Sequence, residues 1–346
     1  MVSAIRSAFS LYTSAASRQA RLVRFGLGII ASLGLGWLAL RGLDGDLVLD
    51  ALRDLPPYVV ALALGIFLLS NLARAYRWRL LFLQERISVY RLFLVENMGL
   101  GLNNLLPLRI ASEAAQFTIL TLRDKISRGT ALATLGMTRV MDIWASTLLL
   151  AVGLLIVQGA GQLARYAAGA FVFSLLLVAL VRFLAWESRG FPIMGRVPLL
   201  AIFASSVAEL EGRKTRLLAS LALSTAQWVI LGISGWLVAL GMDIPLSPSQ
   251  AVLVVLATIF FATSIPSLPG AIGTFEAAMI YVAGFFDVSR NQAFPYALVM
   301  HVLLFLPPTL LAAIFLPREG LGSVREFQAW VRQRDKSSSP DTVQES

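Results

Sequence analysis

The sequence predicts an all-α protein that crosses a membrane several times. Hydrophobic residues make up 57% of its 346 residues, charged residues make up only 14%, and the mean hydropathy is +0.75. Its apolar runs approach the ~20 residues that an α-helix needs to cross a hydrocarbon layer of ~30 Å. Soluble domains do not repeat such runs, so most of the chain is predicted to lie in the membrane.

The charge pattern points to a membrane partner. The net charge is +9, but the basic residues fall in short stretches beside apolar runs, where they act as topology signals and contact anionic lipids. We therefore expect membrane lipids as partners and no nucleic acid. The sequence has no cysteine, which excludes disulfides, thiolate nucleophiles and cysteine-based metal sites.

Six uninterrupted spans are predicted. The first follows a basic N-terminus (residues 1–24) that is similar to a signal peptide but has no convincing small-residue cleavage site, so we interpret it as a retained anchor. The membrane domain is predicted over residues 25–316, and residues 317–346 form a cytoplasmic tail that is basic and then disordered. The spans are expected at about 25–40, 57–76, 129–157, 167–185, 217–240 and 293–316.

Two further apolar segments, 92–122 and 251–286, complete the predicted topology. Placing the N-terminus in the cytoplasm puts most Lys and Arg residues on the cytoplasmic side, as the positive-inside rule requires. This assignment of the basic residues requires the first segment to enter and leave the membrane from the cytoplasmic side. The second segment must enter and leave from the opposite side. The expected fold is six spans plus two re-entrant hairpins of opposite orientation, with both termini in the cytoplasm.

Each of these two segments contains a helix break followed by a carboxylate. The breaks are "GLNNLLPLRIASE" (101–113) and "SIPSLPGAIGTFE" (264–276). At membrane depth a helix can break only where protein or a water-filled cavity covers it, and the restarting helix offers free N–H groups to an anion. Paired breaks of this kind predict an inverted repeat with a substrate site near the midplane, although prolines that merely kink packed helices are the alternative. The candidate residues are Asn103, Asn104, Arg109, Glu113, Pro269, Gly270, Gly273 and Glu276.

Arg139 and Asp142 complete the set of candidate substrate-binding residues. They lie three apart on a predicted helix, on one face, where they can pair with each other as a neutral packing element. Alternatively, Arg139 binds a phosphate-bearing headgroup or pairs with Glu113 or Glu276, while Asp142 orients it. Both alternatives stay open from the sequence.

Two other polar residues have two interpretations each, and a third has one. Arg109 is either a cytoplasmic-side anchor or a phosphate donor beside the two asparagines of the first break. His301 is interpreted as a hydrogen-bonded packing residue in preference to a proton relay, and Gln227 as an interhelical hydrogen-bond partner.

Four motifs carry a resemblance to a known family. "RAYRWRLLF", "GLNNLLPLRIASEAAQF", "TRVMDIWA" and "SIPSLPGAIGTFEAAM", in this order, resemble the flippase-like transmembrane family of the lysylphosphatidylglycerol synthases. The resemblance covers about residues 22–316 and extends to stand-alone relatives, including hopanoid-biosynthesis-associated membrane proteins. It implies a protein of the bacterial inner membrane that moves or binds lipids in a central cavity between two re-entrant hairpins.

The resemblance also implies which residues form the site, and two departures qualify it. Asn104, Pro107, Arg109 and Glu113 match the family's first break, Arg139 and Asp142 its charged pair, and Pro269, Gly270, Gly273 and Glu276 its second break. Thr138 stands where many members carry an acidic residue. The chain ends soon after the last span, so we expect no aminoacyl-transfer domain and no lysylation of lipid.

Transport of an amphiphilic lipid, anionic or polyisoprenoid-derived, is therefore the leading functional hypothesis. Glu113 and Glu276 are the candidates for proton coupling, since the sequence has no GxxxxGK[ST] loop for ATP. One alternative is an intramembrane enzyme acting on a lipid phosphate or prenyl diphosphate, although no HExxH or aspartate-rich motif is present. The other is a non-catalytic scaffold that recruits lipid-synthesis enzymes through its basic tail. No cofactor and no metal are expected.

Overall fold

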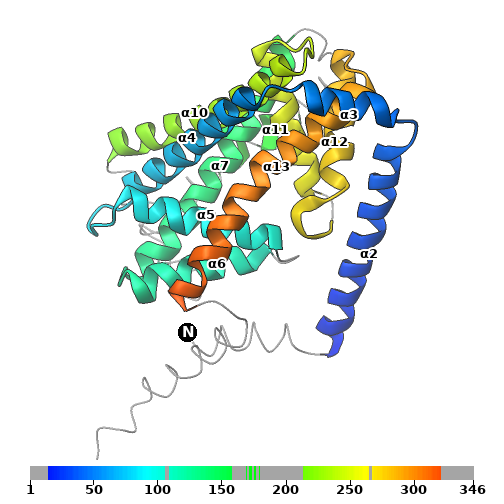
Figure 1. Cartoon of the computed structure of the whole chain (residues 1–346). Coiled ribbons are helices and arrows are strands. Elements are labelled where there is room, and N and C mark those ends of the chain that lie inside the picture. The colour runs from blue at the N-terminus through cyan, green and yellow to red at the C-terminus, as the bar shows by residue number, and fades with distance from the viewer. Residues whose placement is uncertain are drawn as a thin grey trace, which may run out of the picture.

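A computed structural model describes residues 15–105, 109–157, 213–264 and 267–320, together with residues 169, 171–173, 175–176 and 179. The described residues form helices and no strand, which confirms the all-α prediction (Figure 1). Within this described part, four helices are long and apolar enough to cross a membrane: α4 (Pro57–Leu81), α7 (Arg128–Ile156), α10 (Lys214–Gly241) and α13 (Arg290–Phe315). The chain is thus an integral membrane protein. Most of the predicted span at 167–185 lies outside the described residues.

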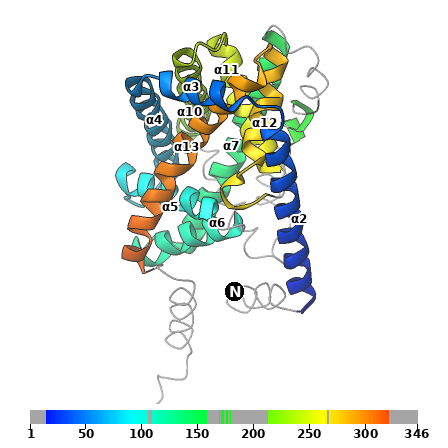
Figure 2. The ribbon, with the colours of Figure 1, turned by 45° about the vertical axis from the view of Figure 1, so that its right-hand side comes forward.

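The N-terminal span differs from its prediction at its end. Helix α2 (Ala15–Leu40) contains the expected apolar run, but α3 (Gly45–Asp54) follows where a loop was expected, bent by 87° from the apolar part of α2. Asp44 starts α3 by accepting hydrogen bonds from the backbone N–H groups of Asp46 and Leu47. Its own N–H donates to Asn291 Oδ1 at 3.1 Å, which fixes α3 beside the start of α13 (Figure 2).

Both predicted broken segments consist of short helices. The first comprises α5 (Val89–Leu105), α6 (Arg109–Thr118) and the π-helix η1 (Ile119–Arg123). The second comprises α11 (Pro248–Ser264), the 3-10 turn η4 (Pro269–Ala271), α12 (Thr274–Ala283) and the 3-10 turn η5 (Gly284–Phe286). At 1.5 Å per residue, the 17 residues of α5 or of α11 span only about 26 Å, less than the ~30 Å of hydrocarbon.

Close backbone contacts hold these segments against the longer helices. A Cβ atom on Gly101 of α5 would lie 2.2 Å from the carbonyl oxygen of Pro308, so α5 meets α13 where only glycine fits. A Cβ atom on Gly273, at the start of α12, would lie 2.4 Å from the carbonyl oxygen of Ser32 in α2. Gly273 also has a φ of 81°, which favours glycine.

Each broken segment packs into its own buried apolar cluster. The larger is built mainly from α11, α12 and α13, and the second from the end of α4 together with α5, η1 and α7. Helix α13 contributes to both clusters and ends in the 3-10 turn η6 (Pro317–Glu319). The two broken segments thus belong to different apolar clusters, and α13 connects them.

Candidate functional site

A cavity of about 530 Å³ lies between the two breaks. Its wall comes from α4, α5, α10, α11, α12, α13 and the second break. Many of the lining side chains are polar, although they belong to helices that are otherwise apolar. These polar lining residues are Ser70, Asn71, Arg74, Asn103, Asn104, Gln227, Trp228, Thr263, Ser264 and Ser267.

The two breaks meet at this cavity. Asn103, Asn104, Pro269 and Gly270 all line it, and the carbonyl oxygen of Asn104 is 3.7 Å from the place a Cβ atom on Gly270 would occupy. The side-chain amide of Asn104 also donates to the carbonyl oxygen of Phe305 in α13, at 3.1 Å. The structure therefore brings together four of the residues that the sequence predicted for a substrate site. Their binding of a substrate stays a prediction.

One face of α4 provides another part of the wall. Phe67, Ser70, Asn71 and Arg74 are spaced i, i+3, i+4 and i+7, which places them on one side of the helix. Asn71 donates from its amide to Asn97 Oδ1 at 3.1 Å, so its position is fixed by α5. Helix α4 thus contributes a polar stripe toward the cavity.

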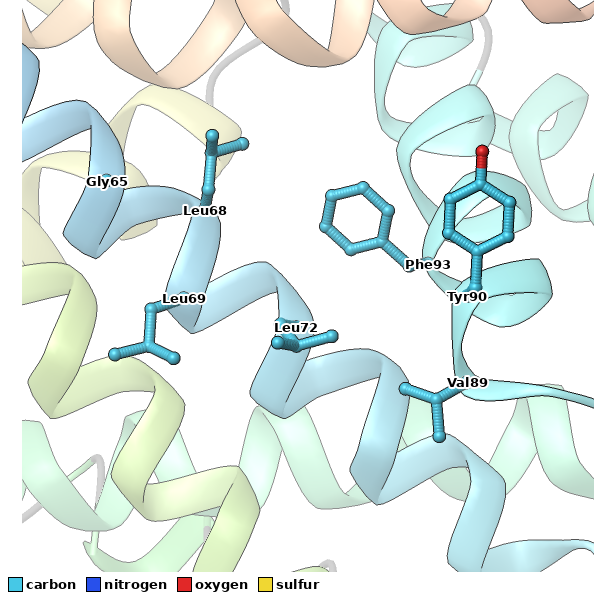
Figure 3. Close-up of a pocket in the computed structure, with 7 residues that line it drawn as sticks. All are labelled: Gly65, Leu68, Leu69, Leu72, Val89, Tyr90 and Phe93. Atoms are coloured by element: carbon cyan, nitrogen blue, oxygen red, sulfur yellow. The ribbon is translucent and has the colours of Figure 1, made fainter.

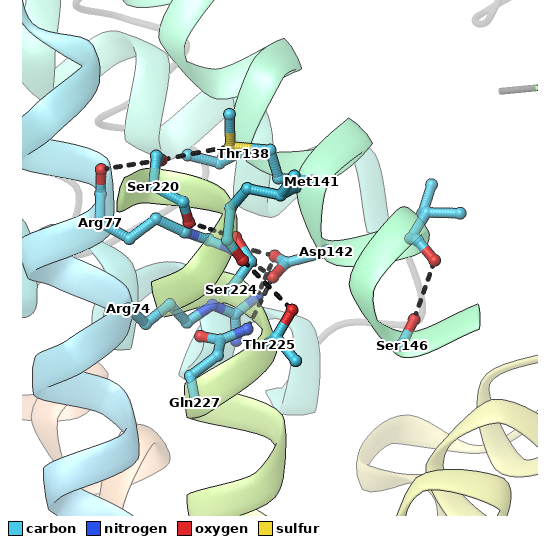
Figure 4. A network of polar contacts seen from close by, with 12 residues as sticks. Arg74, Arg77, Thr138, Met141, Asp142, Ser146, Ser220, Ser224, Thr225 and Gln227 are labelled. Carbon is cyan, nitrogen blue, oxygen red and sulfur yellow. Dashed lines mark hydrogen bonds and ion pairs between the residues drawn. The ribbon is translucent and has the colours of Figure 1, made fainter. Parts of the chain in front are cut away.

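A buried charge network stands beside this stripe (Figure 4). Arg74 donates to Asp142 Oδ2 at 2.9 Å, and the fully buried Arg77 donates to both oxygens of the same carboxylate. Gln227 donates to Asp142 Oδ1 at 2.7 Å, and Arg74 Nε forms an ion pair with Glu96 Oε1 at 2.9 Å. Two guanidinium groups thus face two carboxylates, and the buried charges offset one another.

This network corrects the interpretation of Arg139 and Asp142 as partners of each other. Asp142 is bound by residues of α4 and α10. Arg139 of α7 instead pairs with Oε1 of Glu113 in α6, at 3.1 Å. Pairing of Arg139 with Glu113 was the alternative, and it is confirmed. Arg139 and Glu113 are about one-third exposed, and neither is among the residues that line the cavity.

The second carboxylate, Glu276, is fixed at the start of α12. Its Oε2 accepts a hydrogen bond from the N–H of Gly273 at 2.7 Å, and its Oε1 contacts Nδ1 of His301. The rings of Phe275 and Phe305 pack on His301, with centroids 5.0 and 4.3 Å from it. Since both phenylalanines line the cavity, the Glu276–His301 pair stands directly behind its wall. The expected hydrogen bond of His301 is confirmed, and so is the interhelical hydrogen bond of Gln227. The preference for packing over a proton relay at His301 stays a prediction.

A second depression of about 470 Å³ lies between α4 and α5, and Figure 3 shows its apolar lining. Leu68, Leu69 and Leu72 of α4 line one side of it, and Phe93 and Tyr90 of α5 line the other. Leu69, Leu72 and Tyr90 are exposed. This surface suits contact with hydrocarbon and offers no polar cradle.

Outside the long helices, Arg91 links the start of α5 to the turn after η1 and to η6, which follows α13. Its guanidinium donates to Asp124 Oδ1 at 2.8 Å and to Glu319 Oε2 at 2.9 Å. Asp124 lies in the turn between η1 and α7, where burial raises the pKa of its carboxyl group and the guanidinium of Arg91 opposes that shift. The described residues contain no group of three or more His, Cys, Asp or Glu side chains that could hold a metal ion.

The sequence missed three residues of this region. Arg74 and Arg77 lie in a dense run of arginines that is typical of a cytoplasmic loop, but α4 continues to Leu81 and holds both in the network. Glu96 belongs to no motif that marks it in the sequence, yet it is buried and ion-paired. Arg109 is the first residue of α6, and its side chain and Pro107 lie outside the described part.

Comparison with known families gives one match. The family model described as the lysylphosphatidylglycerol synthase TM region matches residues 25–312. No curated protein matches the chain. The matched range includes both breaks, the charge network and every residue that lines the cavity.

Proposed function

Since the chain belongs to the lysylphosphatidylglycerol synthase transmembrane family, we propose that it is a flippase-like lipid transporter of the bacterial cytoplasmic membrane. The proposed topology has six spans and two oppositely oriented re-entrant hairpins, α5–α6 and α11–α12, with both termini in the cytoplasm. Two observations support it: each of these helices is shorter than a full span, and their breaks meet at one cavity.

The polar cavity is the observation that carries this proposal. Polar and ionisable groups are costly in hydrocarbon and usually mark a substrate pathway. A volume of about 530 Å³ falls within the ~300–1,000 Å³ typical of small-molecule sites. It suits a lipid headgroup whose hydrocarbon tails remain in the membrane.

In the proposed mechanism, the cavity opens alternately toward the two faces of the membrane. The two broken segments are the natural moving parts, because their short helices pack on longer ones and restart after proline-containing breaks. Glu113 and Glu276 are proposed to couple movement to proton binding. Each is held by one basic partner, Arg139 or His301, and loss of its charge would release that contact.

The pairing of the carboxylates favours transport over an intramembrane enzyme. In the enzyme hypothesis, the carboxylates serve as metal ligands and Arg139 as a phosphate clamp. Glu113 is occupied by Arg139, Asp142 by Arg74 and Arg77, and Glu276 by His301. Binding of a metal ion by these carboxylates would require several of the ion pairs to break. The scaffold hypothesis concerns the tail beyond residue 320 and stays a prediction.

Proteoliposomes containing the purified full chain test the proposal. Labelled lipids are added with the label on one leaflet, and the fraction of headgroups accessible from outside is followed in time. We expect protein-dependent movement of one lipid class and its loss in Glu276→Gln and Arg139→Ala. Folded protein that moves none of the anionic, zwitterionic, glycosylated or polyprenyl lipids would contradict transport.

A further inference from the structure

We infer that the headgroup bound in the cavity is uncharged and polyhydroxylated, a glycerol or sugar moiety attached to a lipid. This inference rests on the proposed lipid-binding function and specifies its substrate class. Three features of the described cavity wall carry it: its balanced charge, its unpaired donor and acceptor, and its combination of amide groups with aromatic rings.

The charge of the wall offers little to an anion. Of the described side chains that line the cavity, only Arg74 is charged. It is already shared between Asp142 at 2.9 Å and Glu96 at 2.9 Å. A phosphate would have to compete with both carboxylates for this guanidinium, and it would bring a second negative charge close to them. Desolvation of a charged headgroup adds further cost.

Two buried polar atoms of the lining residues lack partners in the described structure. Asn103 Oδ1 is an acceptor, and Trp228 Nε1 is a donor. A hydroxyl group can both donate and accept, whereas a phosphate oxygen only accepts and an ammonium group only donates. A hydroxylated ligand can satisfy both atoms with one kind of group. Both atoms have almost no exposed surface, so each side chain must turn to reach the ligand.

The remaining wall has the same chemistry. Asn71, Asn104 and Gln227 are held through their amide nitrogens by Asn97, Phe305 and Asp142. Fixed amides of this kind present their carbonyl oxygens as acceptors for hydroxyl protons. Trp228, Phe275 and Phe305 add flat apolar faces that can cover the C–H groups of a ring.

A binding comparison with matched lipids tests the inference. The detergent-solubilised full chain is titrated with monoglucosyl diacylglycerol, phosphatidic acid and phosphatidylethanolamine that carry identical acyl chains. We expect the glucosyl lipid to bind at least about tenfold more tightly than the other two, the ratio that one additional satisfied polar pair provides. Equal or tighter binding of phosphatidic acid would overturn the inference.

Three variants locate the effect. Trp228→Phe keeps an aromatic ring but removes the indole N–H. The dissociation constant for the glucosyl lipid should therefore rise about five- to tenfold. Trp236→Phe is the matched control, because Trp236 lies on the same helix and packs against the apolar cluster. Arg109→Gln tests whether the side chain of Arg109, which lies outside the described part, supplies a positive charge to the bound headgroup. Phosphatidic acid binding that is tight in the wild type and lost in Arg109→Gln would assign an anion site to Arg109 and reject the polyol.

The same lipids in proteoliposomes separate this inference from the proposed function. Movement of the glucosyl lipid alone supports both. Movement of phosphatidic acid in place of the glucosyl lipid would support the proposed transport function and contradict the inferred polyhydroxylated headgroup. Absence of binding and movement for all three lipids, with the protein folded, contradicts both.

Discussion

Asn104 of the first break lies against Gly270 of the second, with its carbonyl oxygen 3.7 Å from the place where a Cβ atom on Gly270 would be. The two residues are 166 positions apart in the sequence and both line the same cavity. Gly270 has a φ of 73°, which allows the chain to turn at this point. This contact joins the two broken segments into one site.

Neutralising Asp142 should strongly destabilise the protein. Asp142→Asn leaves Arg74 and Arg77 in a buried environment with only Glu96 as a counter-charge. Breaking a buried ion pair by removing one partner typically costs about 3–5 kcal/mol. We expect a clearly lower midpoint of thermal unfolding in detergent, measured by tryptophan fluorescence.

Asp50→Asn is the matched control for that substitution. Asp50 pairs with Arg53 at 3.8 Å, and both side chains are more than 60% exposed. Exposed pairs of this kind contribute at most about 1 kcal/mol. If Asp142→Asn and Asp50→Asn unfolded at the same temperature as the wild type, the buried network would have no stabilising role.

A methyl group at Gly273 should disturb the second break. The Cβ atom of Gly273→Ala would approach the carbonyl oxygen of Ser32 to 2.4 Å, and the φ of 81° disfavours alanine. We expect a loss of stability of at least about 1 kcal/mol, with weaker contact between α12 and α2. Gly65→Ala serves as the control, because nothing lies within 4 Å of its Cβ position on α4. Equal stability of the two variants would show that α2 does not pack tightly on the break.

Glu276→Gln should separate structure from proton coupling. The glutamine oxygen can still accept the hydrogen bond from the N–H of Gly273, so the start of α12 should be retained. The variant can no longer change its charge opposite His301. We expect a folded protein that has lost lipid movement at every pH from about 5 to 8, measured in proteoliposomes. Unchanged movement with wild-type pH dependence would rule out Glu276 as the coupling residue.

Loss of Arg91 should produce a pH-dependent defect in stability. Arg91→Gln leaves the carboxylates of Asp124 and Glu319 close together without their shared guanidinium. Burial raises the pKa of Asp124 and Arg91 lowers it, so the substitution raises that pKa further. Protonation relieves the unpaired charge, so the variant should lose about 1–3 kcal/mol near pH 7 and recover part of it on acidification. Thermal unfolding of Arg91→Gln and of the wild type, measured at several pH values from 7 to 5, gives this stability deficit. A deficit that grows toward pH 5 would contradict the assignment.

The sequence predicted the long helices and the breaks well. Pro57 marks the start of α4, and the apolar runs of α7, α10 and α13 lie where hydropathy placed them. Proline and glycine located both breaks, because these residues interrupt helices for reasons of local backbone geometry. Local chemistry was therefore sufficient for these elements.

Pairing between distant helices could not be predicted in the same way. Arg139 and Asp142 share a helix face, but their partners come from α6, α4 and α10. Arg74 and Arg77 have the same local signature as the basic loop residues that follow them, and only tertiary packing distinguishes them. Trp228 gave no signal as a cavity residue, because tryptophan in an apolar run is usual in a membrane helix.

Blocking the cavity is the most direct test of the central claim that lipid headgroups pass between the two breaks. Ser264 lines the cavity with an exposed side chain, so Ser264→Trp should fill it without disturbing the core. Leu62→Trp, on the exposed apolar side of α4, is the control. We predict that lipid movement in proteoliposomes is lost in Ser264→Trp and retained in Leu62→Trp, with both proteins folded. Wild-type movement in Ser264→Trp would contradict the account.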